Sequence, residues 1–243
     1  MDGFDVGVIV RSLPFLGRGM LTSLQLLVLA MAGGITLGTL IAILRISAPK
    51  PIAALAAFYV NGLRSVPLIM AIFWFYLLVP LVTGRQVGAF LSALIAFTLF
   101  EAAYYSEIIR AGIEGVSRGQ AGAALATGLS RTQTYRYIIL PQAFRRMTPV
   151  LLTQSIALFQ DTSLVYVIGL HDFMTAASVV GSRDGRLVEL YGFAALTYFI
   201  ICFAASRLAY VPAKWDPVRR QGHAPTREST ALPGHIGSRS DPI

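Results

Sequence analysis

The chain has 243 residues, of which 55% are hydrophobic and only 13% are charged. Soluble globular domains carry about 25% charged residues, so this balance excludes an ordinary soluble domain. The formal net charge of +8 does not by itself indicate nucleic-acid binding, because the distribution of basic residues along the loops is the better guide. Cys202 is the single cysteine, so the chain forms no intrachain disulfide.

Apolar runs long enough to cross a bilayer, which takes roughly 20 helical residues, make up most of the chain. The runs are continuous rather than alternating, which favours helices over a β-barrel. One run is overlong and is interrupted by Arg64 and Pro67. The sequence predicts an all-α membrane protein with five transmembrane helices, at residues 20–44, 52–82, 88–109, 149–170 and 188–211.

The regions that flank this transmembrane domain, 20–212, differ from it in composition. Residues 1–19 begin with an acidic stretch that lacks the basic leader of a cleaved signal peptide, and we expect an outer lead-in there. Residues 213–243 are rich in Pro, Gly, Ser and Arg, which predicts a disordered tail. Most basic residues fall in the first loop, the central loop 114–147 and the tail. Basic loops stay cytoplasmic, so we expect the N-terminus on the periplasmic side and the C-terminus in the cytoplasm.

Within the first span, Gly34 and Gly38 form a small-residue face that favours close helix packing. The central loop has signals of two short helices. Ser117 with Gln120 fits a capping box, and Ser130 with Gln133 fits a second one. Between them an alanine-rich turn stops at Gly128, a residue suited to a left-handed helix end. The loop is therefore predicted to be a rigid projection outside the membrane.

Charged residues inside the spans are the first candidates for function, since each costs roughly 2.5–3.5 kcal/mol to insert. Arg64 precedes Pro67, where proline leaves a carbonyl without its helical donor. A broken helix beside a cation is suited to binding a carboxylate. Alternatively, Arg64 pairs with a membrane acid and fixes helix packing. Glu107 and Arg110 have the spacing of a helix-surface ion pair, and the role of Glu101 stays open.

A run of four polar residues interrupts the fourth span. They cannot all face lipid, so part of the run is expected to line the bundle interior or a substrate pathway; Asp161 would suit an α-amino group. Alternatively, Asp161 neutralises an arginine on another helix. The outer segment that follows, near Asp172 and Arg183, is polar enough to meet a soluble partner. The polar run consists of Gln160, Asp161, Thr162 and Ser163.

Signatures of enzymes are missing from the sequence. The two lysines, Lys50 and Lys214, do not follow a glycine, so no phosphate-binding loop of the glycine-lysine type exists. The three histidines lack metal-ligand spacing, and no serine or cysteine has a base beside it in the sequence. We therefore expect a transport subunit with no catalytic residue, metal or cofactor of its own. Energy from a nucleotide would have to come from another chain.

The central loop resembles the cytoplasmic loop signature of bacterial ABC importer permeases, which reads Glu-Ala-Ala, three residues, Gly, nine residues, Ile-x-Leu-Pro. The spacing matches throughout, but a glycine takes the place of the usual glutamate. Segments 58–68, 100–113 and 159–166 are similar to polar amino acid permeases, most of all to a glutamate/aspartate system permease. The matching loop residues are Gly122, Ala123, Ala124, Gly128, Ile138 and Pro141.

The resemblance implies an inner-membrane permease of the type I importer kind that takes up polar amino acids, with glutamate or aspartate as the expected substrate. It implies a cytoplasmic ATPase dimer that uses ATP and receives the loop, a second permease subunit, and a periplasmic binding protein, with no nucleic-acid partner. Two alternatives remain at this point. A proton-coupled secondary transporter would use the membrane acids as proton carriers, although the absence of an inverted repeat disfavours it. A membrane scaffold would recruit cytoplasmic proteins through its basic tail.

Overall fold

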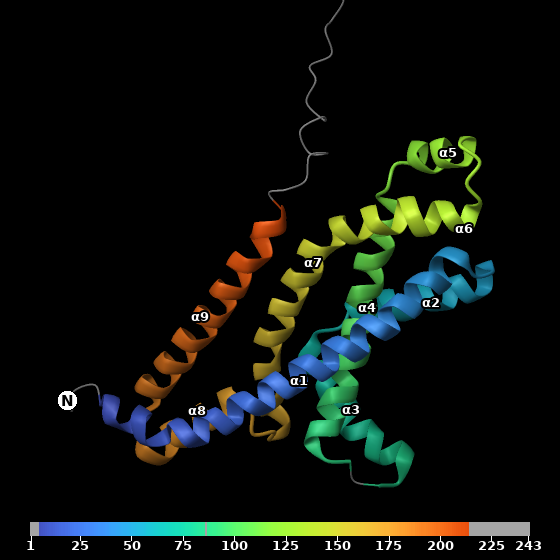
Figure 1. The fold of residues 1–243 in the computed structure, drawn as a ribbon. Helices are drawn as coiled ribbons and strands as arrows, with labels where there is room; N and C mark the ends of the chain where they lie inside the picture. The colour runs from blue at the N-terminus through green and yellow to red at the C-terminus, as the bar shows by residue number, and fades with distance from the viewer. Residues whose placement is uncertain (1–4, 86, 214–243) are drawn as a thin grey trace, which may run out of the picture.

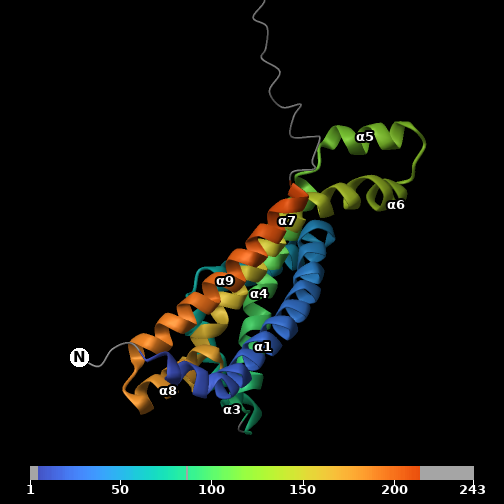
Figure 2. The same ribbon diagram turned by 60° about the vertical axis from the view of Figure 1, so that its left-hand side comes forward.

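A computed structural model describes residues 5–85 and 87–213. Every regular element within these ranges is helical, as the sequence predicts. Residues 1–4 of the expected lead-in and residues 214–243 of the expected disordered tail lie outside the described residues. The long helices form the body of the molecule, and a short arm built around α5 (Arg118–Ala126) projects beyond one end of it (Figures 1 and 2).

Helix α1 (Val6–Ser47) begins after Asp5, whose carboxylate accepts a 2.7 Å hydrogen bond from the Gly7 backbone N–H. This bond satisfies one of the donors that a helix N-terminus leaves free. The helix has 42 residues, about twice the number that the hydrocarbon core requires. Residues 6–19 of the expected lead-in are therefore the first turns of the same helix that carries the first span (Figure 1).

The second span is a broken helix. Helices α2 (Lys50–Arg64) and α3 (Leu68–Thr83) meet at an angle of 108°. Pro67 has no backbone N–H and disfavours the helical conformation in the residue before it, so one helix ends ahead of this proline and another begins after it. The interruption that the sequence predicts near Arg64 is confirmed.

Helix α4 (Ala89–Glu114) lies directly against α1, and glycines make this approach possible. A Cβ at Gly34 would lie 3.0 Å from the Cβ of Glu101, and a Cβ at Gly38 would lie 2.9 Å from the carbonyl oxygen of Ala102. A larger residue at either position would push the two helices apart. The predicted packing role of this small-residue face is confirmed.

The chain then passes through the projecting arm and returns to the membrane. After α5 come α6 (Arg131–Thr134), the π-helical turn η1 (Tyr135–Ile139) and α7 (Leu140–Asp161), followed by the 3-10 segment η2 (Thr162–Ile168). These four segments form one helical run of 38 residues. The predicted fourth span is therefore the inner part of a longer helix that also forms half of the arm (Figure 1).

The outer segment that the sequence presents as a polar loop is in fact helix α8 (Phe173–Asp184), which connects to α9 (Leu187–Ala213). Asp172 is buried, and its carboxylate accepts hydrogen bonds of 3.0 and 2.9 Å from the backbone N–H groups of Met174 and Thr175. It caps α8 and is not available to a soluble partner, which corrects the expectation for Asp172; Arg183 at the other end of α8 is exposed, and a partner there stays a prediction. Aspartate is one of the preferred N-cap residues, and its side chain explains why the helix begins here.

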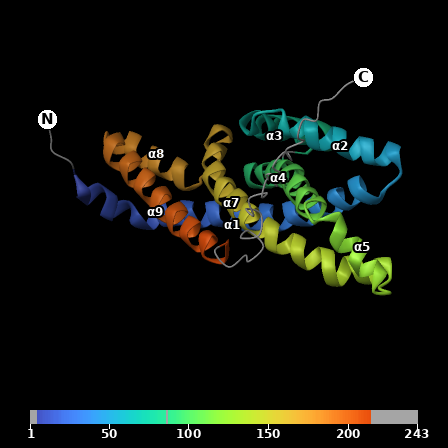
Figure 3. The ribbon, with the colours of Figure 1, turned by 90° about the horizontal axis from the view of Figure 1, so that it is seen from above.

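Two clusters of buried side chains hold the bundle together. One lies among α1, α3, α4 and the α7–η2 run, and the other joins the first turns of α1 to α8 and α9. Seen from above, α8 and α9 lie towards one end of the molecule while α2 and α5 lie towards the other (Figure 3). Within the described residues, four helices are long and apolar enough to span a membrane, and the bent α2–α3 pair makes a fifth. The predicted five-span architecture is confirmed.

Candidate functional site

The break between α2 and α3 places Arg64 at the last position of α2. The next residue, Ser65, closes the helix with its backbone N–H and its hydroxyl, which donate to the Asn61 carbonyl at 3.1 and 2.7 Å. The Arg64 guanidinium lies over the ring of Tyr104 on α4, 5.2 Å from the ring centroid. This is a cation–π contact, and it leaves the donors of the guanidinium available to a further acceptor.

Arg64 lines a cleft of about 380 Å³ between α2, α4 and α7. The only acidic residue in its wall, Glu107, is already paired with two arginines outside the cleft, so the wall is basic in balance. A basic cleft of this size between membrane helices is suited to an anionic group of a small molecule. Its lining consists of Arg64, Tyr104, Glu107, Ile108, Ala111, Gly112, Arg146, Met147, Val150 and Gln154.

Gln154 joins this cleft to a buried carboxylate. Its side-chain amide donates to both carboxylate oxygens of Glu101, at 3.1 and 3.2 Å, and Glu101 is completely buried. Because the nitrogen of Gln154 is held by Glu101, the amide has a fixed orientation at the edge of the cleft. Beside this pair, the hydroxyls of Tyr105 and Ser155 lie 3.3 Å apart within hydrogen-bond distance. The sequence left Glu101 undecided and passed over Gln154, an amide within a mainly apolar span.

The C-terminal ends of α1 and α4 are joined by an ion-pair network. Arg45 donates to Glu107 at 2.5 Å, and Arg110 bonds both Glu107 and Glu114. The Arg45 side chain is only 12% exposed, so this pair is better shielded from solvent than a surface salt bridge. The predicted pairing of Glu107 with Arg110 is confirmed, and Arg45 is a partner that sequence spacing cannot reveal.

The polar run at the end of α7 is not part of the cleft that holds Arg64. Thr162 is buried and donates to the Phe159 carbonyl at 2.7 Å, and Ser163 donates to the Gln160 carbonyl at 2.8 Å. Both hydroxyls thus satisfy their own helix backbone. Asp161 is half-buried and, within residues 5–85 and 87–213, has no ion-pair partner; the same holds for Arg64. The alternative that these two charges serve only as packing ion pairs finds no partner in the described part of the chain.

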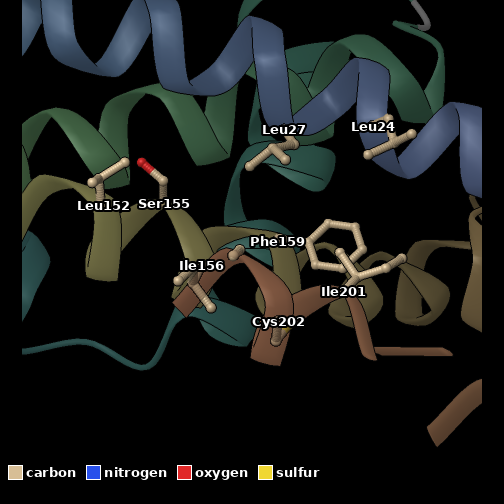
Figure 4. Close-up of a pocket in the computed structure, with 9 residues that line it drawn as sticks. Leu24, Leu27, Leu152, Ser155, Ile156, Phe159, Ile201 and Cys202 are labelled. Carbon is tan, nitrogen blue, oxygen red and sulfur yellow. The ribbon is translucent and has the colours of Figure 1, made fainter. Parts of the chain in front are cut away.

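A second pocket, of about 190 Å³, lies between α1, α7 and α9 and is almost wholly apolar. Figure 4 shows Leu24 and Leu27 on one side of it, with Phe159 and Ile201 opposite and Cys202 nearby. Its polar groups are the Ser155 hydroxyl and the Cys202 thiol, and no charged side chain lines it. Such a pocket cannot stabilise an ionised ligand.

The projecting arm has the hinge that the sequence predicts. Gly128 has φ +87°, and the bonds from Gly128 N to the Leu125 carbonyl (3.0 Å) and from Leu129 N to the Ala124 carbonyl (3.3 Å) form a Schellman motif. Ser130 and Gln133 form the predicted capping box, with bonds of 3.2 and 2.8 Å.

The other predicted capping box is wrong. Ser117 makes no side-chain capping bond to α5, and the Gln120 side chain instead accepts from Gln142 at 3.5 Å. In the matched loop signature, Ala124 is buried and Ala123 is exposed, and nothing lies within 4 Å of a Cβ built at Gly122. The glutamate that would normally occupy position 122 would therefore point away from the arm.

The arm and the bundle are joined firmly. The Arg146 guanidinium donates to the Gly115 carbonyl, which ties the start of α7 to the end of α4. Ile139 and Ala143 are buried against Val116 and pack with Ala121 of α5. Ile138 is half-buried, and Pro141 stands at the second residue of α7, directly after the π-helical turn η1. These contacts join α5 to the helical run that lines the Arg64 cleft.

Five membrane spans, a stiff arm on one side and a basic cleft between the spans define a membrane-spanning transport subunit. The model of the family described as "Binding-protein-dependent transport system inner membrane component" matches residues 34–213. The chain belongs to this family and is a multi-pass component of the inner membrane.

Curated relatives agree with this assignment. The chain is 51% identical over 215 residues to the glutamate/aspartate import permease protein GltK of Escherichia coli O157:H7, covering 86% of this chain and 96% of that one. It is 32% identical to the arginine transport system permease protein ArtQ of Bacillus subtilis (strain 168), covering 81% and 90%. These findings confirm the resemblance to ABC importer permeases that the loop signature indicates, and they make the chain a transport subunit, with ATP hydrolysis assigned to a separate chain.

Solved structures show the same fold. A crystal structure of an amino acid ABC transporter with histidines matches with a TM-score of 0.81 at 31% identity, covering 86% of this chain and 97% of that one. A chain of the MetNI methionine ABC transporter in an inward facing conformation matches with a TM-score of 0.64 at 18% identity, covering 82% and 96%. The second likeness concerns the fold alone.

Proposed function

We propose that this chain forms the membrane pathway of an ATP-driven importer for acidic amino acids, glutamate and aspartate. The observation that carries the proposal is the basic cleft around Arg64, whose only acid is neutralised by Arg45 and Arg110. An acidic amino acid has one net negative charge, and a neutral or basic one lacks it. The names of the 51% identical relatives support the same substrates.

In this proposal Arg64 binds a substrate carboxylate through its free guanidinium donors, while Tyr104 holds the cation in place through its ring. Gln154, oriented by Glu101, presents its amide oxygen to the substrate at the wall of the same cleft. Asp161 and its neighbours Gln160, Thr162 and Ser163 remain candidates for a second part of the pathway, further along the α7–η2 run.

The arm is proposed to be the contact with a dimeric cytoplasmic ATPase, with α5 seated in a cleft of that partner. Rigid packing of α5 on the α7 run supports this role, since ATPase closure would then move the wall of the Arg64 cleft. The proposal includes a periplasmic N-terminus and a cytoplasmic C-terminus, which the distribution of basic loops supports. A second homologous permease subunit and a periplasmic binding protein complete the proposed assembly.

Uptake of labelled amino acids by the reconstituted complex tests the substrate. We expect glutamate and aspartate to be transported with ATP, and Arg64→Gln to lower their uptake at least tenfold, because a charge-assisted hydrogen bond contributes about 1.5–3 kcal/mol. Arg18→Gln, which removes an exposed arginine elsewhere on α1, is the control and keeps uptake. Preferred uptake of arginine or glutamine by the native complex, or full glutamate uptake by Arg64→Gln, contradicts the proposal.

A crosslink tests the coupling role. A Gly122→Cys variant in a Cys202→Ser background has a single thiol, on the open side of α5. We expect it to crosslink to the ATPase chain, and a thiol introduced at position 18 to leave the ATPase unlabelled. Absence of any ATPase crosslink from position 122 would remove the arm from the mechanism.

A further inference from the structure

The helical segment 131–148 has an exposed side whose chemistry the transport function does not use. Tyr137 and Phe144 are 60% and 56% exposed, although both are large and apolar in part. Tyr137, Pro141 and Phe144 are spaced four and three residues apart, which places them on one side of a helix. We call this surface the arginine–aromatic face; it consists of Arg136, Tyr137, Pro141, Phe144 and Arg145, all of them exposed.

The arginine–aromatic face points away from the arm's own partner helix. The opposite side of the same segment is buried, through Ile139 and Ala143, against Val116 and with Ala121 of α5. In Figures 1 and 2, α5 lies on one side of the outer part of this segment, around α6. The face proposed to meet the ATPase and the arginine–aromatic face are therefore different surfaces of the arm.

The position of the segment along the bundle matches the edge of the membrane. Gly112, near the end of the α4 span, has Met147 within 3.2 Å of a Cβ built on it, and Arg146 donates to the Gly115 carbonyl. From this level the segment turns sideways and does not continue along the direction of the spans (Figures 1 and 2). With the end of the α4 span taken as the edge of the bilayer, its residues lie near the depth of the lipid headgroups, where tyrosine and arginine side chains gather.

The charged residues of the arm and the start of α7 are all basic. From Gly115 to Gln160 the sequence has five arginines and neither an aspartate nor a glutamate. Within the described residues none of these arginines forms an ion pair with a carboxylate. The Arg136 guanidinium lies 5.9 Å from the Tyr137 ring centroid, so a cation and an aromatic ring stand together on the exposed side. Unpaired arginines beside exposed aromatic rings at headgroup depth complement an anionic lipid surface.

We propose that the arginine–aromatic face binds the headgroups of anionic phospholipids. Arg136 and Arg145 contact lipid phosphates, and Tyr137 and Phe144 insert at the boundary between headgroups and acyl chains. The segment then rests on the membrane while α5 faces outward, so the lipid supports the arm from below. A protein partner on this face is the competing arrangement, and the accessibility of a label on the face distinguishes the two.

The experiment uses the full complex with its ATPase, reconstituted in bilayers of phosphatidylcholine with or without phosphatidylglycerol. A nitroxide is attached at Phe144→Cys in the Cys202→Ser background, and a matched label is placed at Leu125→Cys, which is exposed on α5. We expect the label at 144 to collide with membrane-dissolved oxygen more often than with a water-soluble nickel chelate, and the label at 125 not to show this preference. Protection of the label at 144 from both reagents means that protein covers the face, which overturns the proposal.

The charge requirement is measured with spin-labelled phosphatidylglycerol and phosphatidylcholine around the same complex. We expect the native face to enrich the anionic lipid, and Arg136→Gln with Arg145→Gln to reduce that enrichment by up to roughly 30-fold, from about 1 kcal/mol for each arginine near an anionic surface. Arg118→Gln with Arg131→Gln removes the same charge elsewhere on the arm and keeps the enrichment. Equal losses in both double variants mean that only the overall charge attracts lipid, and the assignment of the arginine–aromatic face then fails.

Discussion

Substitutions at Gly128 test the effect of the backbone conformation of the arm separately from the effect of its side-chain contacts. The residue has φ +87°, and a Cβ built on it meets nothing within 4 Å, so steric clashes with neighbours are absent. Any effect must therefore come from the left-handed conformation, which costs an L-residue about 1–2 kcal/mol. A β-branched valine is worse than alanine in this conformation, and asparagine tolerates it best.

A cost of that size changes the population of the native turn by roughly 5–30-fold. The Schellman bonds at Gly128 and Leu129 set the angle between α5 and the α7 run, so a rearranged turn displaces α5 from its packed position. We expect ATP-dependent uptake to fall in the order Gly, Asn, Ala, Val at position 128. Insertion and thermal stability of the membrane bundle should stay unchanged, since the arm lies outside the spans.

The measurement is uptake by reconstituted complexes, with thermal unfolding of each variant in detergent measured in parallel. Gly119→Ala is the matched control, because it also adds a Cβ to the arm but at a helical position whose nearest outside atom is 3.5 Å away. Native uptake by Gly128→Val would show that the left-handed turn does not matter for transport. A loss of bundle stability equal to the loss of uptake would show that the arm is not mechanically separate.

Three further predictions concern stability, each followed by thermal or denaturant unfolding. Gly38→Val should destabilise the bundle by about 1–3 kcal/mol because its side chain has no room against α4, and unchanged stability would refute the tight α1–α4 contact. Glu107→Gln should cost about 2 kcal/mol by unpairing Arg45, whereas the more exposed Glu114→Gln should cost under about 1 kcal/mol; equal effects would contradict the network. Asp172→Ala should cost about 1 kcal/mol through the lost helix cap. Burial raises the pKa of the Asp172 carboxyl above its value in the unfolded chain. The contribution of this shift to the free energy of unfolding is therefore present at low pH and is lost as the pH rises through the folded-state pKa. Asp172→Asn keeps the helix cap without the charge. We expect this variant to be at least as stable as the native chain at neutral pH, and any gain in stability to vanish below about pH 4. A gain in stability that grows on acidification would contradict the raised pKa.

Local signals in the sequence were reliable where nothing distant competed with them. The Ser130–Gln133 capping box and the Gly128 helix end were predicted correctly, because their partners lie within a few residues. The Ser117 capping box had the same local pattern and failed, since Gln120 is engaged by Gln142 from the returning helix. Spacing alone does not distinguish these two cases.

Contacts between distant helices could not be predicted in the same way. Arg64 was expected to face either a substrate or a membrane acid, and its observed neighbour is the Tyr104 ring, which hydropathy does not single out. Gln154 was missed because one amide hardly changes the hydropathy of a span, although its bond to Glu101 fixes the edge of the cleft. The five-span fold was recoverable because it depends on lengths of apolar runs rather than on particular pairs.

Two kinds of contact, at two levels along the helices, hold α1 and α4 in a fixed arrangement. Glycines of α1 allow it to pack closely against α4 in the middle of the bundle, and the Arg45–Glu107 ion pair joins the ends of the two helices. Sliding or rotation of one helix against the other would disrupt both the close packing and the ion pair. The remaining walls around Arg64 belong to α2 and the α7 run, so a change in the shape of the cleft would have to come from these two elements.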